Sequence, residues 1–353
     1  MASKPPSSST LGDSLGDSPL FKFRDSSTAA QVNPDRGATD QAGPSRSAVN
    51  SQTADWTCRH VLTGHSSWVR SMAISVDGNF IVSGSGDRSL RVWHLPTGNQ
   101  LYQINSHETW VRCVAACPSS TRFASVSNDN VIRLWDLADG RCLGQMEGHN
   151  SWVRAVTFSP NGKYLFSGGQ DKTICAWDVE RRTLIHRFQG HQHWVRSLDV
   201  SRDGTTLVSG SQDSTVRIYR IKGKGKDHVL QGHQGEVHDV AVSPNNWLLA
   251  SAGADCTVRF WKLNSGRHIT SFKAHTAPIN SLQFSPDGNL LATAGNDGTV
   301  RLWNVEQGKL THVLQGHEGW VWSVAFTANG KSLVSAGWDG TLRVWQRQER
   351  INR

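Results

Sequence analysis

A histidine, a hydroxyl residue and an aspartate recur seven times in this 353-residue chain, always in that order. In hydrolases the same residue types perform nucleophilic catalysis: histidine takes the hydroxyl proton and aspartate orients the histidine. The histidines are His65, His107, His149, His191, His233, His275 and His317. The hydroxyl residues are Ser83, Ser125, Ser167, Ser209, Ser251, Thr293 and Ser335, and the aspartates are Asp87, Asp129, Asp171, Asp213, Asp255, Asp297 and Asp339. Each series advances in steps of 42 residues.

This regularity argues against catalysis. A catalytic triad needs one exposed nucleophile and a group that stabilises the oxyanion, whereas seven identical copies are typical of a packing solution. An aromatic series keeps the same spacing at Trp93, Trp135, Trp177, Tyr219, Trp261, Trp303 and Trp345. We therefore predict that the chain is not an enzyme. Its six cysteines form no CxxC pair and no evident disulfide framework, so we also predict no metal site and no cofactor.

Each 42-residue unit is built from strands and turns. In the unit that starts at Gly148, we expect strands over 152–158, 164–167, 173–177 and 183–188, because these stretches are rich in strand-forming residues. Ser159-Pro160-Asn161-Gly162 separates the first two as a turn, since Pro presets one turn dihedral and Asn-Gly accepts positive φ. The unit is therefore a sheet of four short antiparallel strands.

Seven such sheets can be stable only when they cover one another's faces. A single four-stranded sheet leaves both faces uncovered, whereas seven sheets around an axis cover each other and protect their edges. The chain resembles the WD-repeat (WD40-type) β-propeller family over about residues 57–345, although the literal Trp-Asp pair occurs only at Trp135-Asp136 and Trp177-Asp178. The resemblance implies an all-β fold, a seven-bladed β-propeller, and a His–Ser/Thr–Asp–aromatic hydrogen-bonded tetrad in every blade. We expect all seven tetrads to be complete, with the Tyr219 hydroxyl replacing an indole N–H.

The two ends of the ring are expected to join. The last unit stops at Trp345, after its third strand, and Thr57–Leu62 stands before Gly64-His65 as the fourth strand stands before His in the other units. We therefore predict that an N-terminal strand closes the last blade.

Composition sets the boundaries. Residues 1–53 are rich in Ser, Thr, Pro and Gly with few large apolar side chains, so we expect a disordered tail. The propeller is expected over 54–348 and a C-terminal tail over 349–353. The formal net charge of +8 belongs to the propeller, because the charges of the N-terminal tail cancel. No apolar run is long enough to span a membrane and no secretory signal pattern is present, so we predict no membrane association and a cytoplasmic and/or nuclear location.

Positions that break the sevenfold symmetry in residue type are candidates for binding. In WD-repeat folds, the third and fifth residues after His and the residue before Asp point toward a ligand on the narrow face. Blade 5 has Glu236 and His238 after its histidine and blade 6 has Pro278 and Asn280, so both depart from the Trp and Arg of blades 1 to 4. The candidate partner-binding residues at these positions are Trp68, Arg70, Trp110, Arg112, Trp152, Arg154, Trp194, Arg196, Trp320, Trp322 and Trp338. Trp and Arg are the residue types most enriched at binding hot spots, and Arg pairs bidentately with carboxylate or phosphate. The alternative is that the Trp-Val-Arg sequence was duplicated together with the repeat and has no binding role. Its indoles would then pack neighbouring loops together.

The leading functional hypothesis is a monomeric, non-catalytic scaffold that binds acidic or phosphorylated peptide segments of other proteins. Such a protein would be a subunit or substrate adaptor of a larger complex. One alternative is a methyl-lysine or histone-tail reader that uses Trp320, Trp322 and Trp338 as an aromatic cage. Another is a subunit of an RNA or chromatin complex, since the pI is about 9.4; we consider a nucleic-acid role possible but do not favour it. In the tail, Leu20-Phe21-Lys22-Phe23 follows Ser18-Pro19 and is interpreted as a motif that recruits a partner or folds back onto the ring.

Overall fold

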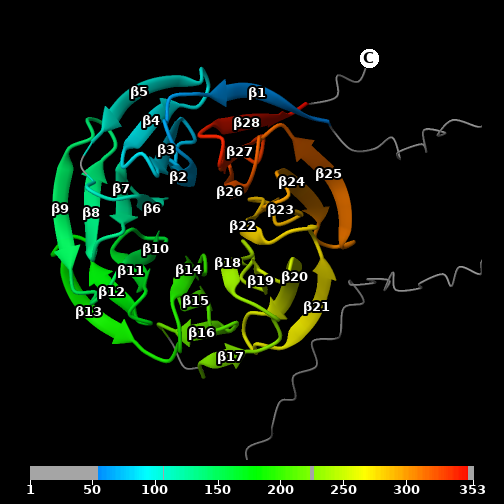
Figure 1. Ribbon diagram of the computed structural model, residues 1–353. Coiled ribbons are helices and arrows are strands. Elements are labelled where there is room, and N and C mark those ends of the chain that lie inside the picture. Colours follow the sequence, from blue (N-terminus) through cyan, green and yellow to red (C-terminus); the bar gives the residue numbers. More distant parts are fainter. Residues whose placement is uncertain (1–54, 106, 223–225, 349–353) are drawn as a thin grey trace, which may run out of the picture.

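The chain folds into a ring of seven sheets around a central channel (Figure 1). The computed structural model describes residues 55–105, 107–222 and 226–348. The tails predicted over 1–53 and 349–353 lie outside the described residues. The prediction of an all-β, seven-bladed propeller is confirmed.

Four antiparallel strands form each blade, and in blades 1 to 6 they follow one another from the channel outward in the order of the chain. Blade 1 comprises β2 (Val69–Ile74), β3 (Phe80–Ser85), β4 (Leu90–His94) and β5 (Asn99–Ile104). Blade 2 comprises β6 (Val111–Ala116), β7 (Arg122–Ser127), β8 (Val131–Asp136) and β9 (Cys142–Glu147). Blade 3 comprises β10 (Val153–Phe158), β11 (Tyr164–Gly169), β12 (Ile174–Asp178) and β13 (Thr183–Phe188). Blade 4 comprises β14 (Val195–Val200), β15 (Thr206–Ser211), β16 (Val216–Arg220) and β17 (His228–Leu230).

The remaining blades repeat this arrangement. Blade 5 comprises β18 (Val237–Val242), β19 (Leu248–Gly253), β20 (Thr257–Lys262) and β21 (His268–Lys273). Blade 6 comprises β22 (Ile279–Phe284), β23 (Leu290–Gly295), β24 (Thr299–Asn304) and β25 (Lys309–Gln315). Blade 7 comprises β26 (Val321–Phe326), β27 (Ser332–Gly337), β28 (Leu342–Arg347) and β1 (Trp56–Leu62). The described part of the chain contains no helix long and apolar enough to cross a membrane.

The core lies between the blades. Val82 and Val92 of blade 1 pack against Phe123 and Trp135 of blade 2 in one buried cluster, and equivalent clusters fill the other boundaries. Because each sheet buries both of its faces, the middle strands are almost continuously apolar or small rather than alternating. The core therefore holds neighbouring blades in fixed positions around the channel.

The N-terminal strand closes the ring, as predicted. β1 pairs antiparallel with β28, from Trp56 opposite Arg347 to Leu62 opposite Leu342. Leu62 is buried, and the Trp56 ring lies 6.2 Å from that of Phe326, edge to face. Strands from the two ends of the described chain therefore share one sheet (Figure 1).

Candidate functional site

The repeated polar residues form a hydrogen-bonded chain inside the blades. In blade 3, Trp177 Nε1 donates to Ser167 Oγ (2.8 Å), a hydrogen bond of 2.7 Å joins Ser167 Oγ to His149 Nε2, and His149 Nδ1 donates to Asp171 (2.9 Å). Blades 1, 5, 6 and 7 repeat these bonds, and in blade 4 the Tyr219 hydroxyl bonds to Ser209. The hydroxyl residue of every blade is fully buried. A buried oxygen with every bond committed is no nucleophile, so these residues stabilise the fold.

Blade 2 departs from the expected set of seven complete tetrads, so that expectation is wrong for this blade. Trp135 and His107 both bond to Ser125 at 2.8 Å, but Asp129 accepts a hydrogen bond from the Arg133 guanidinium (2.7 Å). Among the described residues, no bond joins His107 to Asp129, and the guanidinium lies 3.3 Å from His107 Nδ1. The Asp129 side chain is 26% exposed, against 8–9% for its counterparts. The arginine has displaced the histidine as the partner of this carboxylate.

The six remaining carboxylates predict acid-sensitive folding. Burial raises the pKa of these aspartates, but hydrogen bonds from histidine and nearby backbone N–H groups outweigh it and hold each pKa well below the usual range. Because the unfolded chain then binds protons more tightly, this contribution to stability is complete above about pH 4 and is lost as the pH falls further. We expect the melting temperature to fall steeply between about pH 4 and pH 2. Thermal unfolding followed by circular dichroism measures this, and Asp171→Asn should flatten the slope. A melting temperature unchanged from pH 5 to pH 2.5 would contradict the expectation.

The fifth residue after each tetrad histidine is the bulged residue of an innermost strand. In all seven blades the register of the two inner strands skips this one position. A β-bulge re-aims its side chain, and the seven bulged residues line one channel of about 370 Å³. They are Arg70, Arg112, Arg154, Arg196, His238, Asn280 and Trp322. We call this ring of seven residues the arginine mouth.

Indole rings support the guanidiniums of the arginine mouth. The Arg70 guanidinium lies 4.1 Å from the Trp322 ring centroid, and that of Arg112 lies 5.7 and 5.2 Å from the Trp68 and Trp110 rings. These distances are within the range of cation–π attraction. Each of these arginines touches a tryptophan of the neighbouring blade, so the loops of adjacent blades are held together.

The same arrangement continues through blades 3 and 4. Arg154 lies 5.7 Å from the Trp152 ring and 4.9 Å from the Trp194 ring. The structure thus brings together the tryptophans and arginines predicted on blades 1 to 4. It also shows that their indoles pack against neighbouring loops, as the alternative interpretation proposed.

Neutral amides orient two of the arginines. Arg112 Nε donates to Asn128 Oδ1 (2.6 Å), and Arg154 Nε donates to the Gln170 side-chain oxygen (3.0 Å) in the amide orientation that its neighbours require. Asn128 and Gln170 each directly precede a tetrad aspartate, which is one of the positions expected from the sequence to point toward a ligand. These partners fix the guanidiniums without cancelling their charge.

The carboxylate of Glu236 lies beside the arginine mouth. Glu236 forms an ion pair with Arg196 and lies 3.5 Å from His238 Nε2. Burial and the positive charge of nearby arginines lower the pKa of His238 to about 4, so it is neutral at pH 7. Burial and the three neighbouring guanidiniums lower the pKa of Arg70 to about 9. Arg70 therefore remains charged at pH 7, in an environment that disfavours that charge.

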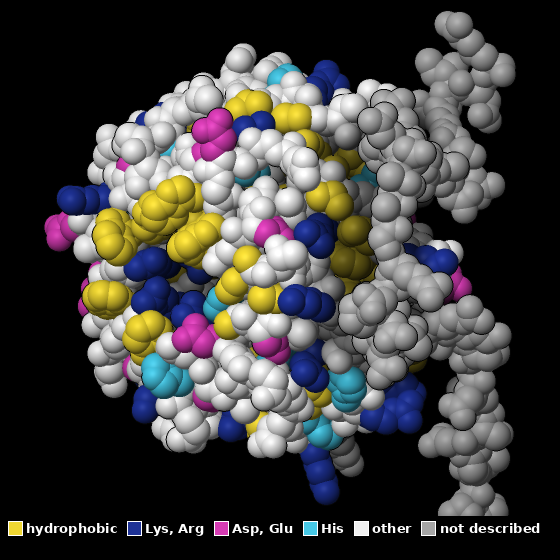
Figure 2. Space-filling model, turned by 45° about the vertical axis from the view of Figure 1, so that its right-hand side comes forward, with side chains coloured by type: hydrophobic (Ala, Val, Ile, Leu, Met, Phe, Trp, Pro, Cys, Tyr) yellow, Lys and Arg dark blue, Asp and Glu magenta, His cyan; other side chains and the backbone are white. Residues whose placement is uncertain are grey.

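Blade 7 adds an aromatic cluster beside the mouth. The Trp320 ring lies 5.4 Å from Trp322 and 5.3 Å from Trp338. Trp338 is 50% exposed and Trp320 is 43% exposed, and Trp110 and Trp152 are also exposed. Figure 2 shows Lys and Arg side chains in a hollow that hydrophobic side chains border.

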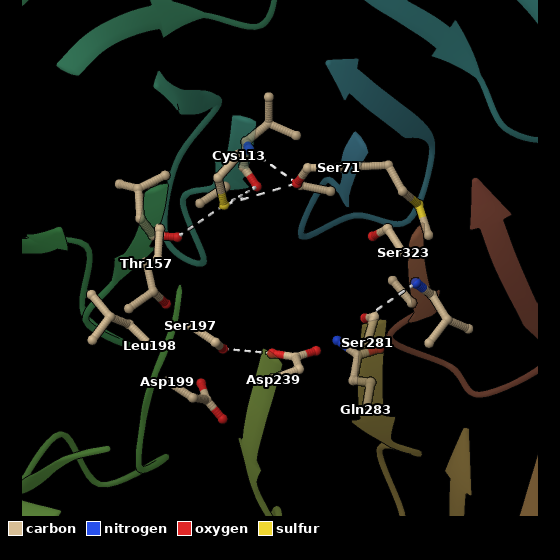
Figure 3. A pocket seen from close by; sticks show the side chains of 18 of the residues that line it. Ser71, Cys113, Thr157, Ser197, Leu198, Asp199, Asp239, Ser281, Gln283 and Ser323 are labelled. Carbon is tan, nitrogen blue, oxygen red and sulfur yellow. Dashed lines mark hydrogen bonds between the residues drawn. The ribbon is translucent and has the colours of Figure 1, made fainter. Parts of the chain in front are cut away.

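Polar residues line the channel below the mouth (Figure 3), and two of them were not predicted from the sequence. Asp199 accepts a hydrogen bond from Val242 N (2.7 Å) and Asp239 accepts one from Leu282 N (2.8 Å), each in the following blade. Burial raises the pKa of Asp199 to about 7 and also raises that of Asp239. The available signal was a break in the repeat, since the equivalent position to Asp199 is alanine in four blades. Their bonds satisfy backbone groups of the innermost strands.

Comparison with known protein families agrees with this architecture. The family described as "WD domain, G-beta repeat" matches residues 56–94, 98–136 and 140–178. The family described as "IFT122 first beta-propeller" matches residues 176–350. The chain belongs to the WD40-repeat family. Propellers of this family are typically non-catalytic. In this WD40 propeller the matched repeat 98–136 begins with β5 of blade 1 and ends with β8 of blade 2, so each repeat interlocks two blades.

Short stretches of this WD40 propeller are similar to proteins of known name. It is 42% identical over 45 residues to the pre-mRNA-splicing factor prp46 of Emericella nidulans, which is 13% of this chain and 10% of the relative. It is 39% identical over 46 residues to the ribosome biogenesis protein ERB1 of Debaryomyces hansenii, covering 13% of this chain and 6% of the relative. It is 36% identical over 64 residues to the protein Mut11 of Chlamydomonas reinhardtii, covering 18% and 17%. The aligned stretches thus span less than a fifth of each relative.

Proposed function

We propose that this WD40 propeller is a scaffold that binds acidic or phosphorylated peptide segments of partner proteins at the arginine mouth, on the narrow face. The observation that carries the proposal is the convergence of four guanidiniums on one mouth, where only Arg196 forms an ion pair, with Glu236, among the described residues. Like charges held this close repel one another, and a bound anion relieves that repulsion. Arginine also presents several N–H donors in a planar fork that matches carboxylate and phosphate.

Unused donors support a ligand at this place. Trp322 Nε1 and Arg196 Nε are buried and make no hydrogen bond within the described part of the chain. Buried polar atoms are almost always paired in folded proteins, so each exception calls for an explanation. The exposed Trp110, Trp152, Trp320 and Trp338 would supply apolar contact around the anionic group.

Membership of a larger complex is the second part of the proposal. The relatives named above include a pre-mRNA-splicing factor and a ribosome biogenesis protein, which fits a subunit or substrate adaptor of a nuclear assembly. We propose the nucleus as one location of this protein, because splicing and ribosome biogenesis begin there.

The geometry gives less support to a methyl-lysine reader. The Trp322 ring already carries the Arg70 cation at 4.1 Å, and Trp320 packs against both other members of the cluster. The nearby acid, Glu236, is committed to Arg196. A methyl-lysine cation would be repelled by the Arg70 guanidinium, and the three indoles already pack against one another and leave no cage for it.

Charge reversal of three arginines tests the proposed function. We expect the full chain carrying Arg112→Glu, Arg154→Glu and Arg196→Glu to lose a defined set of protein partners in affinity purification followed by mass spectrometry. The matched control reverses Arg141, Arg181 and Arg267, which are exposed and lie away from the mouth, and should retain those partners. Melting temperatures of both variants establish that the ring is folded.

The same samples distinguish the alternatives. Partners that disappear after nuclease treatment of the wild-type sample indicate a nucleic-acid bridge. A partner set that survives both nuclease and mouth reversal would contradict the proposal. Binding of a phosphoserine-peptide mixture, followed by tryptophan fluorescence, should exceed binding of the unphosphorylated mixture and should weaken as salt rises.

A further inference from the structure

A second candidate surface lies between blades 3 and 4, at the opposite end of the strands from the arginine mouth. β10 begins beside Trp152 at the mouth and runs to Phe158, and the turn that follows it borders a groove of about 620 Å³. Six strand residues separate the two ends by about 17–20 Å. We call this the blade 3–4 groove; it is separate from the proposed peptide site.

The groove has an apolar floor and a positively charged rim. Tyr164, Phe166, Phe188 and Ile221 provide the floor, and 52% of the Ile185 side chain is exposed at its edge. Arg220 also lines the groove, with its guanidinium bonded to Thr206 and to the Leu263 and Asn264 carbonyls. The exposed basic rim residues are Arg202 and Lys222, with Asp203 beside them. Neither basic side chain forms a salt bridge with a described residue. The surface therefore suits an apolar segment that carries negative charge.

Blade 4, which borders the groove on one side, has a short outer strand. Among the described residues, β17 has three residues and pairs with Val216–Ile218, whereas the outer strands of the other blades have six or seven. At two other boundaries a glycine turn packs tightly onto the preceding outer strand. A Cβ on Gly140 would lie 2.8 Å from the Tyr102 ring, and one on Gly266 would lie 2.6 Å from Leu230. Blade 4 has no glycine at the equivalent position, which is Lys224.

The N-terminal segment 11–21 has the complementary chemistry. Its sequence, Leu-Gly-Asp-Ser-Leu-Gly-Asp-Ser-Pro-Leu-Phe, contains Asp13 and Asp17, no basic residue and four large apolar residues. The Leu-Gly-Asp-Ser unit occurs twice in succession, so apolar and acidic groups alternate. It also includes part of the Leu20–Phe23 motif, which the arginine mouth does not explain.

Chain length and direction allow this segment to reach the groove. β1 starts at Trp56 and runs toward His65 at the mouth, so the chain enters the ring at the groove end. Extended chain spans about 3.3 Å per residue, so the residues from 22 to 55 can cover about 110 Å. A folded domain of this size is only about 50 Å across.

We propose that residues 11–21 bind in the blade 3–4 groove of the same chain. Leu20 and Phe21 contact the apolar floor, and Asp13 and Asp17 face Arg202 and Lys222. The occupant is thus the protein's own N-terminal segment.

Photo-crosslinking in the full chain tests the proposal. With p-benzoylphenylalanine in place of Phe21, irradiation of dilute protein should yield an intramolecular crosslink to 160–166 or 185–188, mapped by mass spectrometry. The same probe in place of Ala30 is the matched control and should not crosslink there. Arg202→Glu with Lys222→Glu should reduce the crosslink at least fivefold. Adding Asp13→Lys and Asp17→Lys should restore it.

Each other outcome overturns the proposal. Crosslinks scattered over the ring, or none, would show that the groove does not bind this segment. A crosslinked dimer at the same site would assign the groove to a second copy of the chain. A crosslink insensitive to charge reversal would remove the role of Arg202 and Lys222.

Discussion

Deletion of residues 1–63 is expected to lower the free energy of unfolding by more than about 3 kcal/mol, whereas deletion of residues 1–53 should change it by less than about 1 kcal/mol. The longer deletion removes β1, the outer strand of blade 7, which pairs with β28 from Trp56 to Leu62. Loss of the buried Leu62 alone is comparable to a large-to-small substitution in a core, which costs about 2–5 kcal/mol.

Deletion of β1 also exposes a strand edge, in addition to removing its contacts. Without β1, the hydrogen-bonding edge of β28 is unpaired, and an exposed strand edge is prone to pair with other chains. We expect the longer deletion to aggregate on heating. Urea unfolding measured by tryptophan fluorescence compares the two truncated proteins. Equal midpoints would contradict closure of the ring by β1.

Replacement of Asp171 by alanine is expected to destabilise the protein by about 1–3 kcal/mol, and replacement of Asp129 by clearly less. Asp171 accepts hydrogen bonds from His149 Nδ1 and Asn150 N, so its removal leaves a buried imidazole N–H without an acceptor. Asp129 is more exposed and its carboxylate bonds to Arg133 rather than to histidine.

The two substitutions control for each other because they remove the same side chain at equivalent positions of neighbouring blades. Chemical denaturation of both variants provides the comparison. Equal losses of stability would show that blade 2 also relies on its aspartate, although Asp129 bonds to Arg133 and not to His107. No loss at Asp171 would remove the tetrad as a source of stability.

The fold was predictable because its determinants repeat. Seven copies of one strand-and-turn pattern specify one blade geometry, and the placement of Thr57–Leu62 before the first Gly-His indicated closure of the ring. Local turn chemistry and a strict period are properties of neighbouring residues, and these are readable along a chain. The blade 2 tetrad could not be predicted, because Arg133 reaches Asp129 only through the positions that their side chains take in the folded blade.

The candidate site, like the fold, was predictable from the sequence only in part. Its tryptophans and arginines were found by their phase relative to the tetrad histidines, and the bulge at that phase explains why one position turns its side chain to the channel. The stacking of Arg112 between indoles of two blades, and its bond to Asn128, depend on loops brought side by side by the ring. Asp199 and Asp239 satisfy backbone groups of the next blade, a demand that exists only once the blades are assembled.

By itself the sequence determined the repeat, the number of blades, the closing strand and the residues that break the symmetry, because these follow from local pattern and count. Only the tertiary structure decided which of those residues meet: four guanidiniums at one mouth, an arginine in place of a histidine in blade 2, and a groove beside a shortened strand. Electrostatic and packing partners are set by distances across blade boundaries, which no spacing along the chain contains.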